Sequence, residues 1–77
     1  MQNKTIEPGL YRHYQGNVYH VLFTARHTEF GYLMVVYEEK DAPERKYVRP
    51  AAMWFDLVGA DEDGNHIRRF TRCNDAE

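Results

Sequence analysis

Residues 9–29 read Gly-Leu-Tyr-Arg-His-Tyr-Gln-Gly-Asn-Val-Tyr-His-Val-Leu-Phe-Thr-Ala-Arg-His-Thr-Glu and carry the clearest strand pattern of the chain. The second half, 18–25, is rich in β-branched and aromatic residues and follows a Gly-Asn pair. This pattern is typical of two strands joined by a tight turn. We therefore predict a β-hairpin with strands at 9–14 and 18–25.

The register of this hairpin decides which side chains enter the core. A two-residue loop at 16–17 places Arg12 opposite Val21, whereas a three-residue loop at 15–17 places Tyr11 opposite Val21. Burying an unpaired guanidinium costs more free energy than burying a tyrosine ring, so we predict the three-residue loop. The residues expected to face inward are Tyr11, His13, Tyr19, Val21, Phe23 and Ala25. The residues expected to face outward are Arg12, Tyr14, His20 and Thr24.

The rest of the chain is also rich in strand and turn signals. Residues 32–38 are nearly continuous in apolar side chains, which favours a central strand, and the charged segment 39–45 indicates an exposed loop. A short strand at 46–49 stops at Pro50, because proline cannot donate to a sheet ladder. One helical turn is expected at 51–55, with Met53 and Trp54 covering the open end of a barrel and Trp54 largely buried.

An Asp-Gly pair at 63–64 separates two further strand candidates, 55–60 and 67–72. The chain thus holds about five short strands and at most one helical turn. This combination predicts an all-β fold, a small and strongly bent antiparallel sheet or partly open barrel. At 77 residues we expect one domain over 9–72, between a flexible arm at 1–8 and a flexible tail at 73–77.

Composition and charge restrict the possible partners and the compartment. The formal net charge of −2 argues against attraction of the whole molecule to nucleic acid. The single cysteine, Cys73, cannot form an internal disulfide. No charged-then-apolar leader pattern opens the sequence, and no apolar run approaches the roughly 20 residues that span a bilayer. We expect a cytoplasmic protein without membrane contact, and a monomer.

Several blocks of the sequence belong to one known pattern. They are Gly-Leu-Tyr-Arg-His-Tyr-Gln-Gly at 9–16, Ala-Arg-His-x-Glu at 25–29, Val-Val-Tyr at 35–37, Val-Arg-Pro at 48–50 and Arg-Phe at 69–70. With these blocks the chain resembles, from Gly9 to Phe70, the small bacterial family called domain of unknown function 1653. The resemblance implies an SH3-like barrel, in line with the strand count, and implies no activity.

His27 and Glu29 form the only pattern that suggests catalysis. An imidazole and a carboxylate two residues apart on an extended segment are the minimum for a general acid/base pair. The alternative is a histidine held by a neighbouring carboxylate at a strand end, and we favour it because the chain contains no serine and its one cysteine is near the C-terminus. We assign no catalytic residue, and an enzyme that uses His27 and Glu29 is a distant alternative.

The histidines do not form a metal-binding pattern. His13, His20, His27 and Glu29 lack the close paired spacings of zinc sites, and on the predicted register His13 and His20 face opposite ways. The glycines are scattered and form no phosphate-binding loop. We therefore expect neither a metal nor a cofactor.

Arginines alternate with aromatic residues along the chain. Such a mixture suits phosphate contacts and base stacking on RNA, or another anion. An aromatic groove of this kind also takes extended peptides, and a third interpretation is that the aromatic residues are core and the arginines pair internally. We predict a non-enzymatic binding module for a partner protein or peptide, with RNA or another anion as the alternative. The candidate ligand-binding residues are Arg12, Tyr14, Arg26, His27, Glu29, Tyr47 and Arg49, of which the three arginines are expected to converge.

Overall fold

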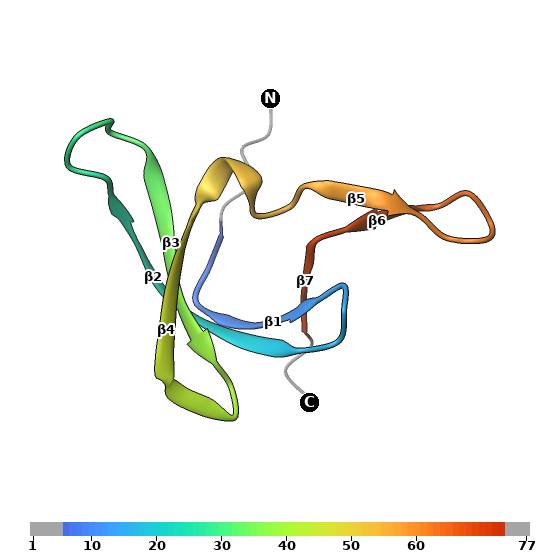
Figure 1. Cartoon of the computed structure of the whole chain (residues 1–77), viewed down its shortest axis with the longest axis horizontal. Helices are drawn as coiled ribbons and strands as arrows, with labels where there is room; N and C mark the ends of the chain where they lie inside the picture. The colour runs from blue at the N-terminus through green and yellow to red at the C-terminus, as the bar shows by residue number, and fades with distance from the viewer. Residues whose placement is uncertain (1–5, 74–77) are drawn as a thin grey trace.

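The structure, a computed structural model, describes residues 6–73. Five antiparallel strands form the main sheet in the order β4-β3-β2-β1-β7, and β5 pairs with β6 in a separate hairpin (Figure 1). The all-β fold with a single short helical turn is thereby confirmed. The elements are β1 (Gly9–His13), β2 (Val18–Arg26), β3 (Leu33–Glu39), β4 (Ala42–Pro50), the 3-10 turn η1 (Ala51–Met53), β5 (Leu57–Ala60), β6 (His66–Arg68) and β7 (Phe70–Arg72).

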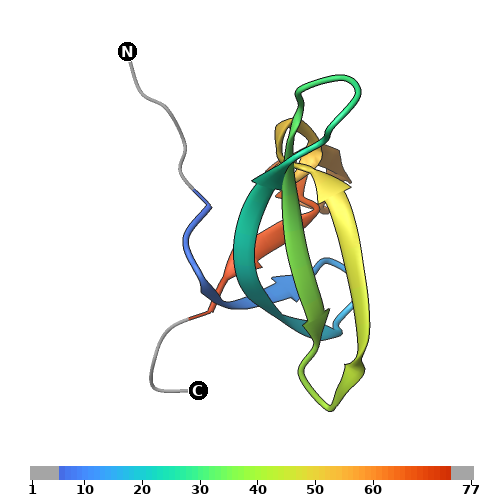
Figure 2. The ribbon, with the colours of Figure 1, turned by 90° about the vertical axis from the view of Figure 1, so that its left-hand side faces the viewer.

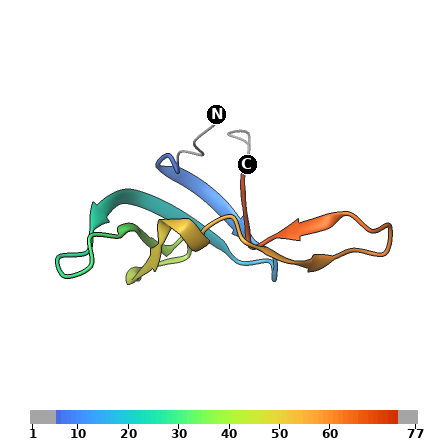
Figure 3. The same cartoon turned by 90° about the horizontal axis from the view of Figure 1, so that it is seen from above.

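The main sheet is strongly curved, and the β5–β6 hairpin projects from it. Figure 2 shows β2, β3 and β4 side by side as one bent layer. Seen from above, the β5–β6 hairpin extends on the side of the molecule opposite the β2–β3 turn (Figure 3). This arrangement is compatible with the SH3-like barrel that the resemblance implies. No helix within residues 6–73 is long and apolar enough to cross a membrane.

Aromatic rings fill the concave side of the sheet. Trp54, which follows η1, stacks on Phe70 of β7 with the ring centroids 3.8 Å apart and the planes 2° from parallel. Trp54 is fully buried, which confirms its predicted place in the core, but Met53 is 43% exposed, so the prediction that it also covers the core is wrong. A domain of this size depends on such large side chains, because it buries a modest fraction of its surface. The buried core consists of Tyr11, Val21, Val35, Tyr37, Trp54 and Phe70.

The pairing of the first hairpin is shifted by two residues from the predicted register. Tyr11 lies opposite Tyr19 rather than Val21, because β1 ends at His13 and the turn includes Tyr14. The turn is closed by hydrogen bonds from the His13 amide to the Asn17 carbonyl (2.8 Å) and from the Gly16 amide to the His13 carbonyl (2.7 Å). A shift of two residues keeps every side chain on its face. Tyr11 and Val21 are accordingly buried, as predicted.

A β-bulge at Leu22 reverses the faces of the second half of β2. Val21 lies opposite Tyr37 but Phe23 lies opposite Val36, so β2 contains one extra residue. Beyond a bulge the alternation of side chains changes side. Phe23 is therefore 56% exposed, and Ala25 is exposed as well. The prediction that both face inward is wrong for this reason.

Two further element boundaries differ from the sequence-based expectation. The charged segment that we expected to be a loop is mostly strand, since β4 begins at Ala42. Ala42 and residues 46–50 pair with β3, and the register shifts between them at residues 43–45. Pro43 and Pro50 are tolerated there because β4 is an edge strand. The expected last strand is divided at Arg69. The Arg69 amide donates to the Asp56 backbone carbonyl (2.7 Å), and the Arg69 carbonyl accepts from the Tyr14 amide (2.8 Å).

The residues before and after the barrel are described only in part. Of the expected flexible arm, residues 1–5 lie outside the described residues, and so do residues 74–77 of the expected tail. Ile6 packs against the core, and the Tyr11 hydroxyl donates to the Glu7 carbonyl at 3.0 Å. The described part of the arm is therefore held against the domain.

Candidate ligand-binding surfaces

The three arginines that we expected to converge lie on different parts of the molecule. Arg12, in β1 beside buried Tyr11, is on the outer face of the sheet. Arg49, in β4, lies opposite buried Val35 and so faces the concave side. Arg26 ends β2, where its Nη1 donates to the Gly31 carbonyl at 3.0 Å. A single surface formed by all three is therefore not present.

His27 and Glu29 lie at the β2–β3 turn, beside Arg26, but do not form an acid/base pair. Nδ1 of His27 accepts hydrogen bonds from the backbone amides of Glu29 (3.1 Å) and Phe30 (3.3 Å). The imidazole ring lies against the rings of Phe30 and Tyr32, with centroids 5.1 and 6.0 Å away. The histidine thus shapes the turn, and its contact with Glu29 is through the main chain.

Tyr47 and Arg49 lie on the concave side of β4. The Tyr47 hydroxyl donates to the Glu39 carboxylate, and this hydrogen bond raises the pKa of Tyr47. Half-buried Arg49 lies close enough to His13 to disfavour its protonation, as does Arg69. Burial of the ring is the largest cause of the lowered pKa of His13, followed by Arg69 and then Arg49. These residues support the aromatic core.

We expect His13 to make the domain less stable in mild acid. Its folded-state pKa is depressed, so its contribution to stability is complete above the ordinary histidine pKa of about 6.5 and is lost as the pH falls through the folded-state value. In addition, its Nδ1 accepts a hydrogen bond from the Gln15 amide (3.2 Å). Urea midpoints at about pH 7.5 and pH 5 should therefore differ less in His13→Gln than in the wild type. His66→Gln, which removes an exposed histidine of β6, is the matched control; an unchanged pH difference in His13→Gln would contradict the assignment.

Arg12 and Tyr14 line a groove between β1, β6 and β7, here called the basic groove. Its volume is about 580 Å³, and none of the described residues that line it carries a carboxylate. Two residues of this groove, His66 and Arg68 of β6, were not predicted from the sequence. The only indication of them was a slight excess of basic residues near the C-terminus. The lining residues are Arg12, His13, Tyr14, His66, Ile67, Arg68, Thr71, Arg72 and Cys73.

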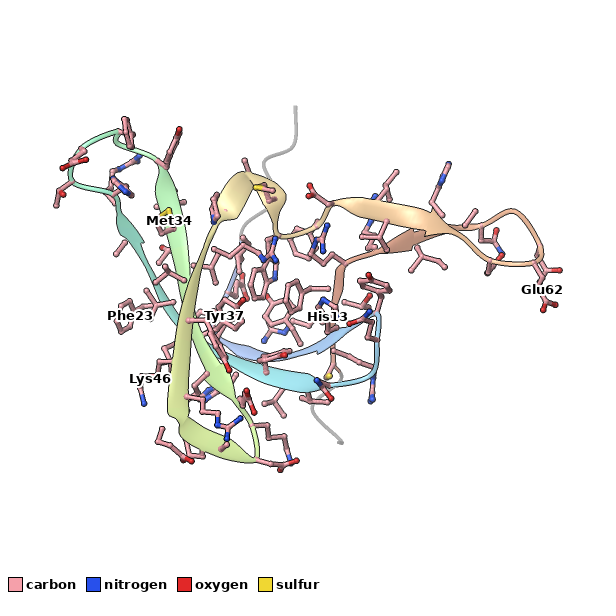
Figure 4. The ribbon with its side chains drawn as sticks, in the orientation of Figure 1. His13, Phe23, Met34, Tyr37, Lys46 and Glu62 are labelled. Atoms are coloured by element: carbon pink, nitrogen blue, oxygen red, sulfur yellow. The ribbon has the colours of Figure 1, made fainter. Side chains whose placement is uncertain are left out.

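The outer side of β2, β3 and β4 exposes apolar side chains in two cross-strand rows, here called the outer apolar face. In the first row, Phe23 lies opposite Val36, which lies opposite Val48. Phe23 is 56% and Val48 62% exposed. Figure 4 shows Phe23 directed away from the side on which Tyr37 lies. The second row consists of Ala25, Met34 and Pro50.

A polar row borders the outer apolar face. Glu38 lies between His20 and Lys46, at 3.4 Å from the His20 ring nitrogen and 3.1 Å from the Lys46 ammonium. These contacts lower the pKa of Glu38, chiefly through the hydrogen bond to Lys46. Nowhere in the described residues do three histidine, cysteine, aspartate or glutamate side chains converge in a way that suits a metal ion.

The fold and these surfaces define a small all-β domain with an aromatic core, an exposed apolar sheet face and a basic groove. A family model of proteins of unknown function, DUF1653, matches residues 9–72, and the chain belongs to this family. The crystal structure of a DUF1653 protein from Bordetella bronchiseptica is similar, with 30% sequence identity and a TM-score of 0.73 over 88% of this chain and 87% of that one. No functionally curated protein matches the sequence.

Proposed function

We propose that this domain is a non-enzymatic binding module that docks a partner protein on the outer apolar face. The observation that carries the proposal is the row of Phe23, Val36 and Val48, which crosses three strands and leaves two large side chains mostly open to water. Contiguous apolar patches on small soluble domains commonly mark interaction sites. Covering them removes apolar surface from water, at roughly 25 cal/mol for each Å².

The bulge at Leu22 supports this interpretation. Without the extra residue, β2 would continue its alternation, and Phe23 would point toward the core like Val21. Bulges often re-aim a side chain where function requires it. A phenylalanine directed outward by a bulge, in a domain short of core, is difficult to explain by folding stability alone.

The surroundings of the face have the composition of an interface border. On one side, the row of His20, Glu38 and Lys46 supplies charged groups, which suit the polar rim of a protein interface. Beyond the other end, the β2–β3 turn exposes the rings of Phe30 and Tyr32. β4 borders the face with an edge that pairs with no other described strand, so an extended segment of the partner has backbone groups to bind as well. The cytoplasmic location and the monomeric state stay predictions.

The proposal is tested with variants of the two most exposed side chains of the face. Proteins cross-linked to the tagged wild type in an extract of the source organism are identified, and the enriched partner is purified and titrated. Phe23→Ser and Val48→Ser should each weaken its binding by about tenfold or more, the loss typical of an interface hot spot. Leu57→Ser is the matched control, since Leu57 is also half exposed but lies on β5.

Three results would contradict the proposed docking face. One is unchanged binding by Phe23→Ser and Val48→Ser at unchanged stability. The second is an equal loss in Leu57→Ser, which would indicate general apolar stickiness. The third is a wild-type dimer that Phe23→Ser dissociates, because a second copy would then cover the face.

A further inference from the structure

We propose that the basic groove binds the phosphate of a nucleotide unit and that the Tyr14 ring stacks on its base. The residues that line the groove come mainly from β1, β6 and β7, whereas the outer apolar face belongs to β2, β3 and β4. Figure 1 labels these strands. The inference is therefore independent of the docking surface proposed above.

The charge of the groove is the first argument. Arg12 makes no hydrogen bond or ion pair within residues 6–73, so its guanidinium is available to a ligand. Arg68 donates from Nη1 to the Phe55 carbonyl at 2.9 Å, which fixes its position and leaves its other donors available. Guanidinium groups bind phosphate through two parallel hydrogen bonds. Two such groups from different strands, with no carboxylate among the lining residues of 6–73, suit an anion better than a neutral ligand.

A third arginine, Arg72, is held in place and contributes less. Its Nη1 lies 3.6 Å from a Glu7 carboxylate oxygen, and its Nη2 donates to the Pro8 carbonyl at 3.2 Å. Its guanidinium also lies over the Tyr11 ring, 5.5 Å from the centroid. Arg72 therefore closes one side of the groove, while Arg12 and Arg68 carry its unneutralised charge.

Tyr14 supplies the aromatic surface beside these charges. The main chain at Tyr14 is fixed by the hydrogen bond from its amide to the Arg69 carbonyl, and its ring lies 4.6 Å from the His13 ring at a tilt of 35°. The side chain is nevertheless 46% exposed. A partly exposed aromatic ring beside guanidinium groups is the arrangement that binds nucleotides by stacking and phosphate contact.

The size of the groove is compatible with one nucleotide. About 580 Å³ lies within the range of roughly 300–1,000 Å³ usual for small-ligand sites. Two sources present the same chemistry to this groove, a free nucleotide and a unit of single-stranded RNA. An acidic peptide would offer carboxylates but no planar base for Tyr14.

Cys73 provides a direct reporter of occupancy. It lines the groove and is the only cysteine of the chain, so iodoacetamide alkylates a single site. Cys73 and Arg12 also line a neighbouring pocket with Glu39 and Asp41, so the Arg68 and Tyr14 variants are needed to assign the protection to the basic groove. The rate of alkylation is measured by mass spectrometry with octauridine RNA, uridine 5′-monophosphate, inorganic phosphate or hexaglutamate. We expect octauridine, uridine monophosphate or both to slow the reaction in a saturable way. Protection by octauridine alone identifies a strand as the source, and protection by the mononucleotide identifies a free nucleotide.

Four variants separate the phosphate contacts from the stacking contact. For the nucleotide probe that protects Cys73, Arg12→Gln and Arg68→Gln should each raise the Kd by about tenfold and lower its salt dependence. Tyr14→Ala should raise the Kd by about tenfold, and Tyr14→Phe should restore binding because it retains the ring. Arg26→Gln is the matched control, since Arg26 lies at the β2–β3 turn. Fluorescence of Trp54 verifies that each variant is folded.

Several outcomes would overturn the inference. Equal protection by hexaglutamate would show that the groove recognises carboxylates or negative charge in general. Equal protection by inorganic phosphate, with no effect of Tyr14→Ala, would remove the base from the model of recognition. Absence of protection by all four probes at low salt, or equal affinity of folded Arg12→Gln and the wild type, would exclude the site.

Discussion

Alanine in place of Trp54 is expected to lower the free energy of unfolding by about 3–5 kcal/mol, a large part of the roughly 5–15 kcal/mol that stabilises a typical domain. Trp54 is fully buried, stacks on Phe70 and meets the Tyr37 ring edge-to-face with the centroids 4.9 Å apart. Removing the indole leaves a cavity at the centre of a core of six residues. Urea denaturation followed by circular dichroism measures the loss.

The variant Trp54→Phe measures how much of this stability a smaller aromatic ring retains. The indole Nε1 is buried and has no hydrogen-bond partner among the described residues. An unsatisfied buried donor costs roughly 1–3 kcal/mol, so its removal offsets part of the lost contact area. The phenylalanine variant should therefore be clearly more stable than the alanine variant. A cost for Trp54→Ala below about 1 kcal/mol, typical of a surface position, would show that the ring does not form the core.

Substitution of Gly9 by alanine is expected to have the second largest effect, about 1–3 kcal/mol of lost stability. Gly9 has φ = +142°, in a region that residues with a Cβ rarely adopt. An added Cβ would also lie 2.8 Å from Nη2 of Arg72, closer than such atoms approach. The substitution therefore strains the start of β1 and displaces the guanidinium from its place beside Glu7 and Pro8.

The two causes can be measured separately with Arg72→Ala. In that background the side-chain contact is gone and only the backbone strain remains, so Gly9→Ala should cost less than in the wild type. Unfolding free energies of the wild type, both single variants and the double variant form the cycle. Equal costs in the two backgrounds would assign the whole effect to the backbone, and no cost in the wild type would contradict the strain argument.

The sequence predicted the elements of the fold better than it predicted which side chains of a strand face inward and which face outward. Gly16 and Asn17 located the first turn, and the burial of Trp54 followed from its place after Pro50 in a domain short of core. The bulge could not be predicted, because Val21, Leu22 and Phe23 are all apolar and an extra residue among them leaves no break in the pattern. The face of Phe23, and with it the outer apolar face, depends on that one residue.

The candidate ligand-binding residues were predicted individually but not as a group. Arg12 and Tyr14 do lie together, yet their neighbours His66 and Arg68 come from a hairpin far along the chain. Pairing of β1 with β7, where Arg12 lies opposite Thr71, brings these segments together. Such long-range pairing has no local signal. The start of β4 around Pro43 was wrongly predicted to be a loop. Its position at the edge of the sheet, which has no local signal either, tolerates residues that normally indicate a loop.

The pairing of β1 with β7 also governs the order in which this chain can fold during synthesis. The strands from β1 to β4 are made first and pair with their neighbours in sequence, but Phe70, on which Trp54 stacks, lies in β7 and is made after all of them. Until β7 leaves the ribosome, the Trp54 ring lacks the Phe70 ring on which it stacks, and the sheet has a free edge at β1. We expect the nascent domain to remain open until β7 emerges, and its closure to depend on contacts between distant parts of the sequence, which slow folding.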